Sequence, residues 1–352
     1  MLRFGIAGTG AIVPKNAKAI LDCDMTELVY IGGRNPEKAQ ALCEKFGAPH
    51  YGTLDDLVQS EHVDAVYLAL PTGVRAPWVL KAIKNNKHVL VDKPVAASVK
   101  EAEELTEAAK KQGVIFMDGT MWLQASRTEE IRSVLHQERL LGDLKYVHAV
   151  FSAFHPEKDV KEGIRGQLDM EPFGAIGETG WYPFGAILFA YDYEMPSRVS
   201  CFSRQMDNGV FYHMWCRLEW KDGRVAQLDS GYGLPLRQYF EIVGAKGILR
   251  VNDYIGPPVE SNESFFGPTA AKSEYYWIMT DDRPNWIFGK GETRTAKNVK
   301  ERHEVEMFYN FANAVKDKKQ NEYWVKSSVS TVRVIEAAIA SAKKNGEYVQ
   351  IE

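Results

Sequence analysis

The stretch "GTGAIVPKNAKAI", from Gly8 to Ile20, sits immediately after a short apolar run, Phe4–Ala7, and opens a helical pattern. Gly8 and Gly10 form a G-x-G pair at this junction, where the backbone has to turn tightly and can approach a pyrophosphate. Phosphate then binds the amide groups at the start of the helix, because the helix dipole favours an anion there. Val13 stands in place of the third glycine of the pattern. The stretch therefore favours a dinucleotide loop over its alternative, an ordinary glycine turn between strand and helix.

The first 120 residues continue this alternation of strand and helix. Apolar runs typical of buried strands lie at Phe4–Ala7, Leu28–Ile31, Ala65–Leu70, His88–Val91 and Val114–Met117. Amphipathic stretches typical of helices lie at Pro36–Phe46, Ala76–Asn86 and Val99–Gln112. Strands and helices that alternate at this spacing form βαβ units, in which a parallel sheet carries helices on its faces. The sequence thus predicts an α/β fold that begins with a dinucleotide-binding Rossmann domain over residues 1–120.

From about residue 145 the pattern changes to alternating apolar and polar residues separated by turns. Segments with this pattern are Tyr146–Phe154, Arg198–Phe202, Val210–Trp220, Val225–Tyr232, Tyr239–Val243 and Gly247–Val251. Alternation of this kind is typical of an antiparallel sheet with one face covered. We therefore expect a second, α+β domain over residues 121–352, with a large open antiparallel sheet, for substrate binding and oligomerisation.

The last hundred residues combine a predicted loop region with two predicted helices. Residues 253–298 are rich in Gly, Pro and Trp and are expected to be mostly loop. Helical patterns at Lys300–Asp317 and Ser327–Lys344 close the chain, and these C-terminal helices are candidates to pack back on the first domain. The Trp-rich segment 276–290 is expected either in a subunit contact or in the substrate pocket.

Composition excludes several classes of protein. The chain has 352 residues, 45% hydrophobic and 26% charged, with a formal net charge of −4. That balance leaves no basic face for a phosphate backbone, so nucleic acid is not an expected partner. The chain opens in a strand-like pattern without room for a signal peptide, and no apolar run approaches the ~20 residues that span a bilayer. We expect a soluble, cytoplasmic protein without a membrane partner.

Cysteine and histidine spacing argues against two further kinds of site. Cys23, Cys43, Cys201 and Cys216 are scattered and form no C-x-x-C pair, which argues against a disulfide framework and a thiolate zinc site. The eight histidines show no H-x-x-x-H or similar ligand spacing. No metal cofactor is expected.

The end of the second predicted strand bears on the choice of dinucleotide. It reads Tyr30-Ile31-Gly32-Gly33-Arg34-Asn35, without the carboxylate that usually holds the ribose hydroxyls of NAD. A carboxylate would repel a 2′-phosphate, whereas Arg34 can bind one through a charge-assisted fork. The sequence favours NADP over its alternative, NAD. The alternative for Arg34 is a solvated residue at the start of a helix.

Two residues are candidates for proton chemistry. Lys93, in "VDKPVA" (91–96), follows an apolar run at the carboxyl end of a predicted parallel strand, where such sheets line a cofactor crevice. Tyr182 lies in "PFGAIGETGWYPFGAILFA" (172–190), a glycine-rich turn leading into an apolar helix. A phenol has a pKa near 10, and a nearby ammonium group can lower that pKa by favouring the phenolate. The alternatives are a surface lysine and a core tyrosine.

These motifs together resemble the Gfo/Idh/MocA family of oxidoreductases, which includes glucose–fructose oxidoreductase and inositol dehydrogenase. The resemblance covers essentially the whole chain, through residues 8–12, "LPTGVRAPWVLKAIKNNKHVLVDKPVA" (70–96), "GETGWYPFGA" (177–186) and "SVSTVRVIEAAIASAKKNGEYVQI" (328–351). The most specific part, "KHVLVDKP", is similar to the family's Glu-Lys-Pro motif, with Asp92 in place of glutamate.

The resemblance implies roles for individual residues. Lys93 takes the place of the family's catalytic or substrate-orienting lysine, and the proline after it is often cis. The implied cofactor-binding residues are Gly8, Gly10, Ala11, Ile12, Arg34, Leu70, Pro71, Thr72, Asp92, Lys93 and Pro94. Arg75 stands where many relatives have a histidine.

The branch of the family follows from "GETGWYPFG". The inositol dehydrogenase signature has a histidine where this chain has Tyr182 and an aspartate where it has Gly185. A tyrosine at this place is similar to glucose–fructose oxidoreductase and to the dimeric dihydrodiol and NADP-linked D-xylose dehydrogenases. The family commonly pairs through its open sheet, so we expect a homodimer or a larger homo-oligomer.

The resulting hypothesis is an NADP-dependent oxidoreductase that transfers a hydride between nicotinamide and a sugar, polyol or vicinal diol. Tyr182 would be the acid/base, assisted by Lys93. Candidate substrate-pocket residues are Trp122, Arg127, Phe154, His155, Arg165 and Trp181. For each of them a place in the core or in an ordinary turn is the alternative. Two rival functions are a non-catalytic NADP-sensing regulator and an NAD-assisted glycosidase of the same family.

Overall fold

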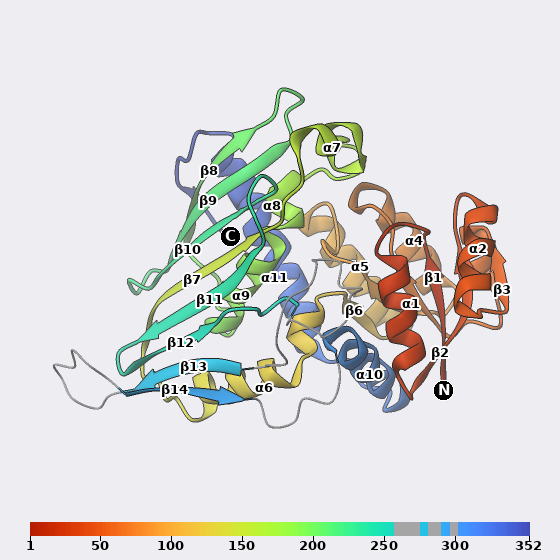
Figure 1. The fold of residues 1–352 in the computed structure, drawn as a ribbon, viewed down its shortest axis with the longest axis horizontal. Helices are drawn as coiled ribbons and strands as arrows, with labels where there is room; N and C mark the ends of the chain where they lie inside the picture. The colour runs from red at the N-terminus through yellow and green to blue at the C-terminus, as the bar shows by residue number, and fades with distance from the viewer. Residues whose placement is uncertain (257–274, 281–289, 296–301) are drawn as a thin grey trace. The chain divides into compact units, whose positions relative to one another are not determined.

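The computed structural model of the chain describes residues 1–256, 275–280, 290–295 and 302–352. The chain divides into two compact units (Figure 1). The first consists of Met1–Met121, Asp169–Pro172 and Glu301–Val332. The second consists of Trp122–Leu168, Phe173–Lys300 and Arg333–Glu352.

A six-stranded parallel sheet forms the centre of the first unit, in the order β3-β2-β1-β4-β5-β6. Its strands are β1 (Leu2–Ala7), β2 (Thr26–Gly32), β3 (His50–Gly52), β4 (Ala65–Leu68), β5 (His88–Val91) and β6 (Phe116–Asp118). The inner strands are buried along nearly their whole length, because helices cover both faces. The predicted Rossmann fold is confirmed, with β3 as an additional short strand.

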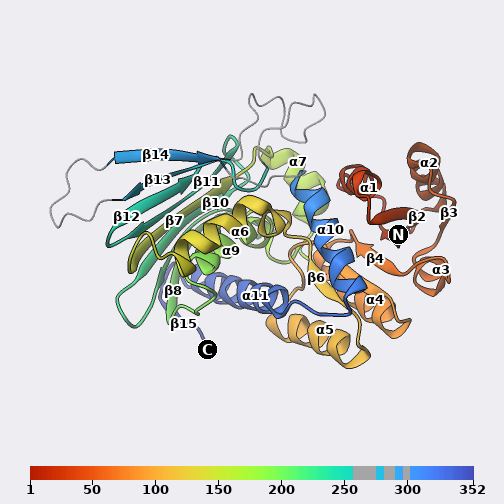
Figure 2. The same cartoon turned by 90° about the horizontal axis from the view of Figure 1, so that it is seen from below.

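The helices of the first unit lie on the two faces of this sheet, as the view in Figure 2 shows for α1 and α10 against α4 and α5. They are α1 (Val13–Asp22), α2 (Pro36–Phe46), α3 (Leu54–Gln59), α4 (Thr72–Lys84), α5 (Val99–Gln112) and α10 (His303–Lys316). The C-terminal α10 packs against α1 and β2. Its Phe308 and Phe311 lie 5.2 and 5.6 Å, centroid to centroid, from the ring of Phe4 on β1. The N-terminal sheet is therefore covered in part by residues from the end of the chain.

The second unit contains a nine-stranded sheet in the order β14-β13-β12-β11-β7-β10-β9-β8-β15. Its strands are β7 (Leu144–Ser152), β8 (Arg198–Gln205), β9 (Phe211–Glu219), β10 (Val225–Gly231), β11 (Arg237–Gly244), β12 (Gly247–Val251), β13 (Tyr275–Thr280), β14 (Lys290–Thr295) and β15 (Val349–Gln350). The open sheet is confirmed, but β7 and β10 pair in parallel, so the sheet is mixed. The expectation of mostly loop over 253–298 is wrong for β13 and β14, and part of the Trp-rich segment, 281–289, lies outside the described residues.

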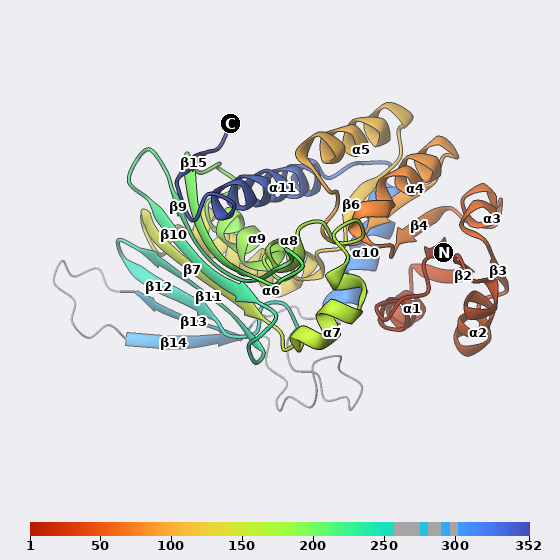
Figure 3. The same cartoon turned by 90° about the horizontal axis from the view of Figure 1, so that it is seen from above.

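Helices cover one face of this sheet (Figure 3). The covering helices α8 (Gly174–Glu178) and α9 (Trp181–Ala190) pack on β7, β9, β10 and β11. All ten residues of α9 are buried. The remaining helices with residues in this unit are α6 (Ser126–Arg132), α7 (Glu157–Glu162) and α11 (Glu322–Ala342), which belongs to this unit from Arg333. On β11 buried and half-exposed residues alternate strictly, the pattern of a sheet with one bare face.

The cysteine prediction needs a correction. Cys201 on β8 and Cys216 on β9 face each other in register and form a disulfide, while Cys23 and Cys43 are free and buried. Cross-strand pairing brought the two sulfurs together, and fifteen residues of separation gave no sign of it in the sequence.

Two searches of the described residues bear on other kinds of site. Within these ranges no helix is both long and apolar enough to cross a membrane. The same ranges contain no group of three or more His, Cys, Asp or Glu side chains placed to hold a metal ion.

Candidate functional site

The loop between β1 and α1 approaches the neighbouring strand closely. Gly8 has a φ of +128°, and a Cβ at this position would lie 2.4 Å from the carbonyl oxygen of Ala69, just past β4. Gly10 is exposed, and a Cβ there would meet nothing within 4 Å. The backbone at Gly10 is thus open to a bulky group in front of the N-terminus of α1. This cradle fits a dinucleotide pyrophosphate.

The end of β2 lies beside the same loop. A Cβ on Gly33 would lie 2.8 Å from the Cγ2 of Thr9, so the Gly33–Asn35 segment adjoins the glycine loop. Asn35 caps α2 by accepting a hydrogen bond of 3.0 Å from the amide of Lys38. Arg34 is exposed and, in the described part of the chain, has no hydrogen-bond or ion-pair partner. An unpaired guanidinium beside a pyrophosphate cradle suits an additional phosphate on the ribose.

The loop after β4 leads into α4 at the same edge. Leu70, Pro71 and Thr72 form this loop and the first helical residue. The Thr72 hydroxyl donates a hydrogen bond of 2.8 Å to Glu171 Oε2, and its amide donates one of 3.3 Å to Oε1. A carboxylate at this position stabilises a helix N-terminus through the exposed amides and the helix dipole. Gly73 also donates to Met170 O, at 2.8 Å, so the segment 169–172 is fastened to α4.

The loop after β5 carries Asp92, Lys93 and Pro94, and the Lys93–Pro94 peptide bond is cis. The amide of Lys93 donates to the Oδ1 of Asp92 at 2.9 Å, and the amide of Asp92 donates to the carbonyl of Leu68 at 3.2 Å. Arg75, which is 3% exposed, donates to the carbonyls of Leu70, Asp92 and Pro94. The carboxyl edge of the sheet therefore brings together all the residues predicted to bind the cofactor.

At the neighbouring strand end, Asp118 of β6 is fully buried. Its carboxylate accepts hydrogen bonds from the Thr120 amide (2.9 Å) and from the hydroxyl groups of Ser328 (2.5 Å) and Ser327 (3.4 Å). Burial raises the pKa of Asp118, although the hydrogen bonds from Thr120, Ser327 and Ser328 act in the opposite direction.

In the second unit, Tyr182 lies on the first turn of α9 and is 7% exposed. Its ring meets the ring of Phe151 edge to face, at 4.9 Å between centroids. A second phenol, Tyr254, is close enough for its ionisation to be affected by a charge on Tyr182. Complete burial raises the pKa of Tyr254 well above its ordinary value, and in the described structure its hydroxyl has no hydrogen-bond partner.

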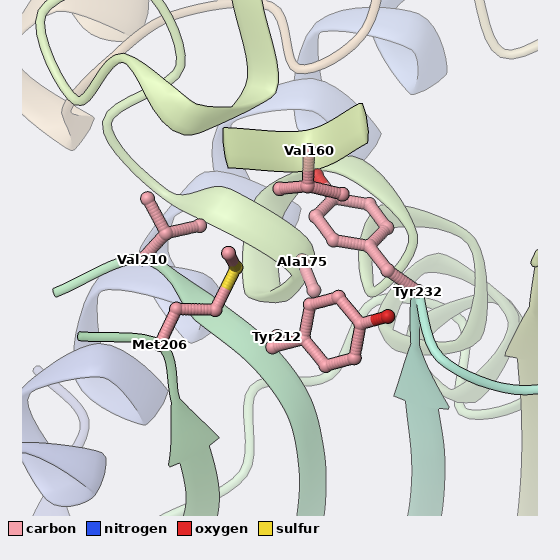
Figure 4. Close-up of a cluster of buried hydrophobic side chains, with 6 residues drawn as sticks. All are labelled: Val160, Ala175, Met206, Val210, Tyr212 and Tyr232. Atoms are coloured by element: carbon pink, nitrogen blue, oxygen red, sulfur yellow. The ribbon is translucent and has the colours of Figure 1, made fainter. Parts of the chain in front are cut away.

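A charged cluster surrounds Glu178, the last residue of α8, four positions before Tyr182 on α9. Glu178 accepts from Arg165 through both oxygens, with Nε at 2.9 and 2.7 Å and Nη2 at 2.6 Å, and it accepts from the Tyr232 hydroxyl at 2.5 Å. Tyr232 is fixed in an apolar cluster, shown in Figure 4, with Val160, Ala175, Met206, Val210 and Tyr212. This cluster holds α7 and α8 against the sheet and so fixes both Arg165 and Glu178.

The other predicted substrate residues are dispersed within the second unit. Trp122 is 1% exposed among the rings of Phe189, Phe240 and Tyr254, the position that the core alternative predicts. Arg127 is buried and pairs with Asp253 at 2.7 Å. The remaining ones are Phe154, which is exposed, Trp181, which is buried, and His155, whose ring contacts Tyr232. Their substrate role stays a prediction.

Sequence reasoning assigned no site role to three residues of the first unit, Arg75, Asp118 and Glu171, or to Glu178 of the second unit. Glu178 could have been found, because it is a carboxylate only four positions before Tyr182 in the same glycine-rich motif. Arg75 follows Thr72 by three positions on α4, and residues three apart lie on the same face of a helix. Glu171 is nearly a hundred residues from Thr72, and only folding reveals that contact.

Comparison with known proteins agrees with this architecture. Residues 2–120 match the family model GFO_IDH_MocA, described as an oxidoreductase family with an NAD-binding Rossmann fold. The chain is 30% identical over 355 residues to D-xylose 1-dehydrogenase (NADP(+)) 2 of Haloferax volcanii, with 100% of both chains covered. The chain belongs to the Gfo/Idh/MocA oxidoreductase family.

Other relatives extend the comparison for this oxidoreductase. Trans-1,2-dihydrobenzene-1,2-diol dehydrogenase of Xenopus laevis is 27% identical over 259 residues, which cover 73% of this chain and 77% of the relative. The aldose-aldose oxidoreductase of Caulobacter crescentus, solved with glycerol, superposes with a TM-score of 0.84 at 19% identity over 99% of each chain, and so shares the fold. The resemblance seen in the sequence is confirmed. The protein is an enzyme of the dehydrogenase and reductase class that uses a nicotinamide dinucleotide.

Proposed function

We propose that this enzyme transfers a hydride between NADP and a hydroxyl-bearing carbon of a sugar, polyol or vicinal diol. The single observation that carries the choice of NADP is Arg34, an exposed guanidinium without a partner in the described structure, beside the glycine loop. The NADP-linked name of the xylose dehydrogenase relative supports the same choice. The names of both sequence relatives support a substrate with neighbouring hydroxyl groups.

We propose that Tyr182 and Lys93 act on the same substrate hydroxyl. A bound nicotinamide would supply the hydride acceptor for the substrate carbon in the oxidative direction, which leaves removal of the hydroxyl proton to side chains of the protein. Tyr182 takes that proton as general base, and returns it as general acid in the reverse direction. Lys93 hydrogen-bonds the substrate oxygen and favours the phenolate of Tyr182 by its charge.

The test measures reduction of NADP⁺ by its near-ultraviolet absorbance over a panel of aldoses, polyols and diols. We expect turnover with part of the panel and a loss of about 10²- to 10⁴-fold in kcat for Tyr182→Phe and Lys93→Met, with NADP⁺ still bound. Tyr254→Phe is the matched control, since it removes a hydroxyl without a hydrogen-bond partner in the described structure and should leave kcat within twofold. Full activity of Tyr182→Phe would contradict the proposal.

Two outcomes would favour the rivals. Tight NADPH binding without turnover on any member of the panel would favour the sensing regulator. Sugar release without net NADPH, from protein that copurifies with stoichiometric dinucleotide, would favour the glycosidase.

We also propose that two copies pair through the bare face of the second sheet. Phe202 and Trp215 face each other across β8 and β9 on that face and are 57% and 46% exposed. Exposed aromatics grouped on an open sheet are typical of an association surface. Light scattering after size exclusion should give a dimeric or larger mass, reduced to one chain by Trp215→Glu with Phe202→Glu. A monomeric wild-type protein would exclude the pairing.

A further inference from the structure

Arg75 is a buried cation without an acidic partner. Its side chain is 3% exposed, and no carboxylate in the described residues lies within ion-pair distance of it. Buried charges in proteins are usually neutralised by an opposite charge, because leaving water costs them several kcal/mol. The guanidinium of Arg75 is bound instead by carbonyl oxygens of the backbone alone. The desolvation of such a guanidinium reduces stability, so we ask what its bonds to these carbonyls contribute.

Those carbonyls belong to the two loops at the carboxyl edge of the sheet. Nε donates to Leu70 O at 2.7 Å, and Nη2 donates to the same oxygen, which fixes the loop after β4. Nη1 donates to Asp92 O at 2.5 Å and also to Pro94 O. The two carbonyls bound by Nη1 belong to the residues directly before and directly after Lys93. One nitrogen thus bridges the backbone on both sides of the proposed catalytic lysine.

Few other groups can hold this segment in place. Proline has no backbone N–H, so Pro94 can be anchored by hydrogen bonding only through its carbonyl, which Arg75 takes. On the other side, the amide of Asp92 is bound to Leu68 O and the amide of Lys93 is bound by the Asp92 carboxylate. On the C-terminal side, Arg75 binds the Pro94 carbonyl, and three residues further on the Ala97 amide donates to the Glu101 carboxylate at 2.6 Å. Arg75 thus holds the residue that directly follows Lys93.

The support behind Arg75 is itself rigid. Arg75 lies on the first turn of α4, whose N-terminus is capped by Glu171 through the Thr72 amide and hydroxyl. A planar fork on a capped helix presents donors in fixed directions, which a lysine ammonium on a flexible stem cannot do. The chain therefore contains a continuous path of hydrogen bonds from the helix to both sides of Lys93.

We infer that Arg75 is a positioning residue for Lys93, and that its bridge between the carbonyls of Asp92 and Pro94 sets where the lysine amine lies. The inference rests on the proposed function, since the position of Lys93 affects turnover only if Lys93 acts on the substrate. A displacement of about 1 Å at a catalytic group can cost about 10²-fold in rate. Arg75 itself touches neither substrate nor cofactor in this proposal.

The test compares Arg75→Lys with Lys87→Met in the full-length enzyme. Lys87 is a matched control, because its ammonium also binds two backbone carbonyls, Ser60 O at 2.7 Å and Val63 O at 2.8 Å, at the opposite edge of the same sheet. Arg75→Lys should lower kcat by about 10²-fold and change the KM for NADP⁺ by less than threefold. Lys87→Met should leave both within twofold, whatever it does to stability.

A double-mutant cycle separates positioning from general damage to the fold. In the Lys93→Met background, Arg75→Lys should cost less than threefold, because the group it positions is gone. If Arg75→Lys costs the same 10²-fold with and without Lys93, or nothing in the wild type, the inference is wrong. Should Arg75→Lys fail to fold, Arg75→Gln takes its place in the cycle, because its side-chain amide can still donate to a backbone carbonyl.

A readout independent of turnover distinguishes this inference from the proposed function. After reductive methylation with ¹³C-formaldehyde, the Lys93 signal in an NMR spectrum is identified by its absence from Lys93→Met. Arg75→Lys should shift or broaden that signal, and Lys87→Met should not. An unchanged signal would overturn the inference. A changed signal together with full activity of Lys93→Met would instead overturn the catalytic role of Lys93 and leave its coupling to Arg75 standing.

Discussion

The two edges of the parallel sheet differ in how their polar groups are satisfied. At the amino edge, Arg3 forks onto Asp64 with Nε at 2.9 Å and Nη2 at 2.6 Å, and Lys87 binds two carbonyls. At the carboxyl edge, the backbone at Gly10 is open and Arg34 has no partner in the described structure. The same strands run through both edges. The polar groups named at the amino edge bond to one another, whereas those named at the carboxyl edge are available to a ligand.

The difference shows where stability and chemistry are separated in this fold. Groups at the amino edge have already found partners, so changes there should alter only the free energy of unfolding. Groups at the carboxyl edge are held ready for a ligand, and some of them are held by other buried groups such as Arg75. Changes there should alter cofactor binding or turnover. The following predictions test this division, beginning with the largest expected effect.

Gly8→Ala should be the most damaging single change. The alanine would keep a φ near +128° only with strain, and its Cβ would lie 2.4 Å from the backbone oxygen of Ala69. We expect a loss of about 3 kcal/mol or more in the free energy of unfolding, measured in urea, together with loss of NADPH binding. Gly10→Ala is the control, because its Cβ would meet nothing. It should fold normally and bind NADPH more weakly; equal destabilisation by both variants would contradict the prediction.

Asp118 should contribute to stability in a pH-dependent way. Asp118→Ala leaves buried donors from Thr120 and Ser328 without an acceptor and should cost about 2–3 kcal/mol. Because burial raises the pKa of Asp118 above its unfolded value of about 3.9, its carboxyl favours folding most when protonated, below that value. As the pH rises from about 4, the wild type should therefore lose stability relative to Asp118→Asn. Urea titrations of both proteins across this range would show a constant difference if the prediction is wrong.

Arg34 should determine which dinucleotide binds. Arg34→Ala should raise the dissociation constant of NADP⁺ by about 10- to 100-fold, since one charge-assisted fork to a phosphate is worth about 1.5–3 kcal/mol. The dissociation constant of NAD⁺ should change by less than threefold. Lys38→Ala removes the same charge four residues later, in the first turn of α2, and serves as the control in fluorescence titrations. An equal loss of affinity for both dinucleotides would remove the assignment of Arg34 to the 2′-phosphate.

Asp64 should give the smallest effect, confined to stability. Burial acts to raise the pKa of Asp64, but the hydrogen bonds and charge of Arg3 outweigh it and hold that pKa below its ordinary value. The pair is about a third exposed, so Asp64→Asn should cost only about 0.5–1 kcal/mol near pH 7. This contribution is present above the unfolded pKa of about 3.9 and is lost as the pH falls below it. Unchanged kcat and KM in Asp64→Asn would support the view that changes at the amino edge affect only stability, and a change in either constant would contradict it.

Local patterns predicted most of the first unit correctly. The spacing of apolar residues predicted the central strands, and the amphipathic stretches Pro36–Phe46 and Val99–Gln112 match α2 and α5 to the residue. The short β3 has no buried residue and so gave no apolar signal. The capping box of Thr53 and Asp56 could have revealed α3.

The second unit depended more on contacts distant in sequence. The parallel pairing of β7 with β10 and the Cys201–Cys216 disulfide follow from strand order, which alternation alone does not specify. Lys93 and Tyr182 were proposed from motifs, whereas the contacts of Arg75 and Glu171 are bonds to backbone groups or to a residue far along the chain, which no motif predicted. Motifs therefore suggest candidates for chemistry more readily than the residues that hold those candidates in place.

The closure of the first unit by Glu301–Val332 affects how the enzyme is made. On a ribosome, β1 is synthesised first, but Phe308 and Phe311, which cover Phe4, leave the exit tunnel only near the end of translation. At the usual rates of elongation, this delay is on the order of tens of seconds. During that time the nascent sheet lacks the rings that cover Phe4, so we expect it to expose apolar surface. A chain that ends before residue 301 should therefore aggregate more readily than the full-length protein.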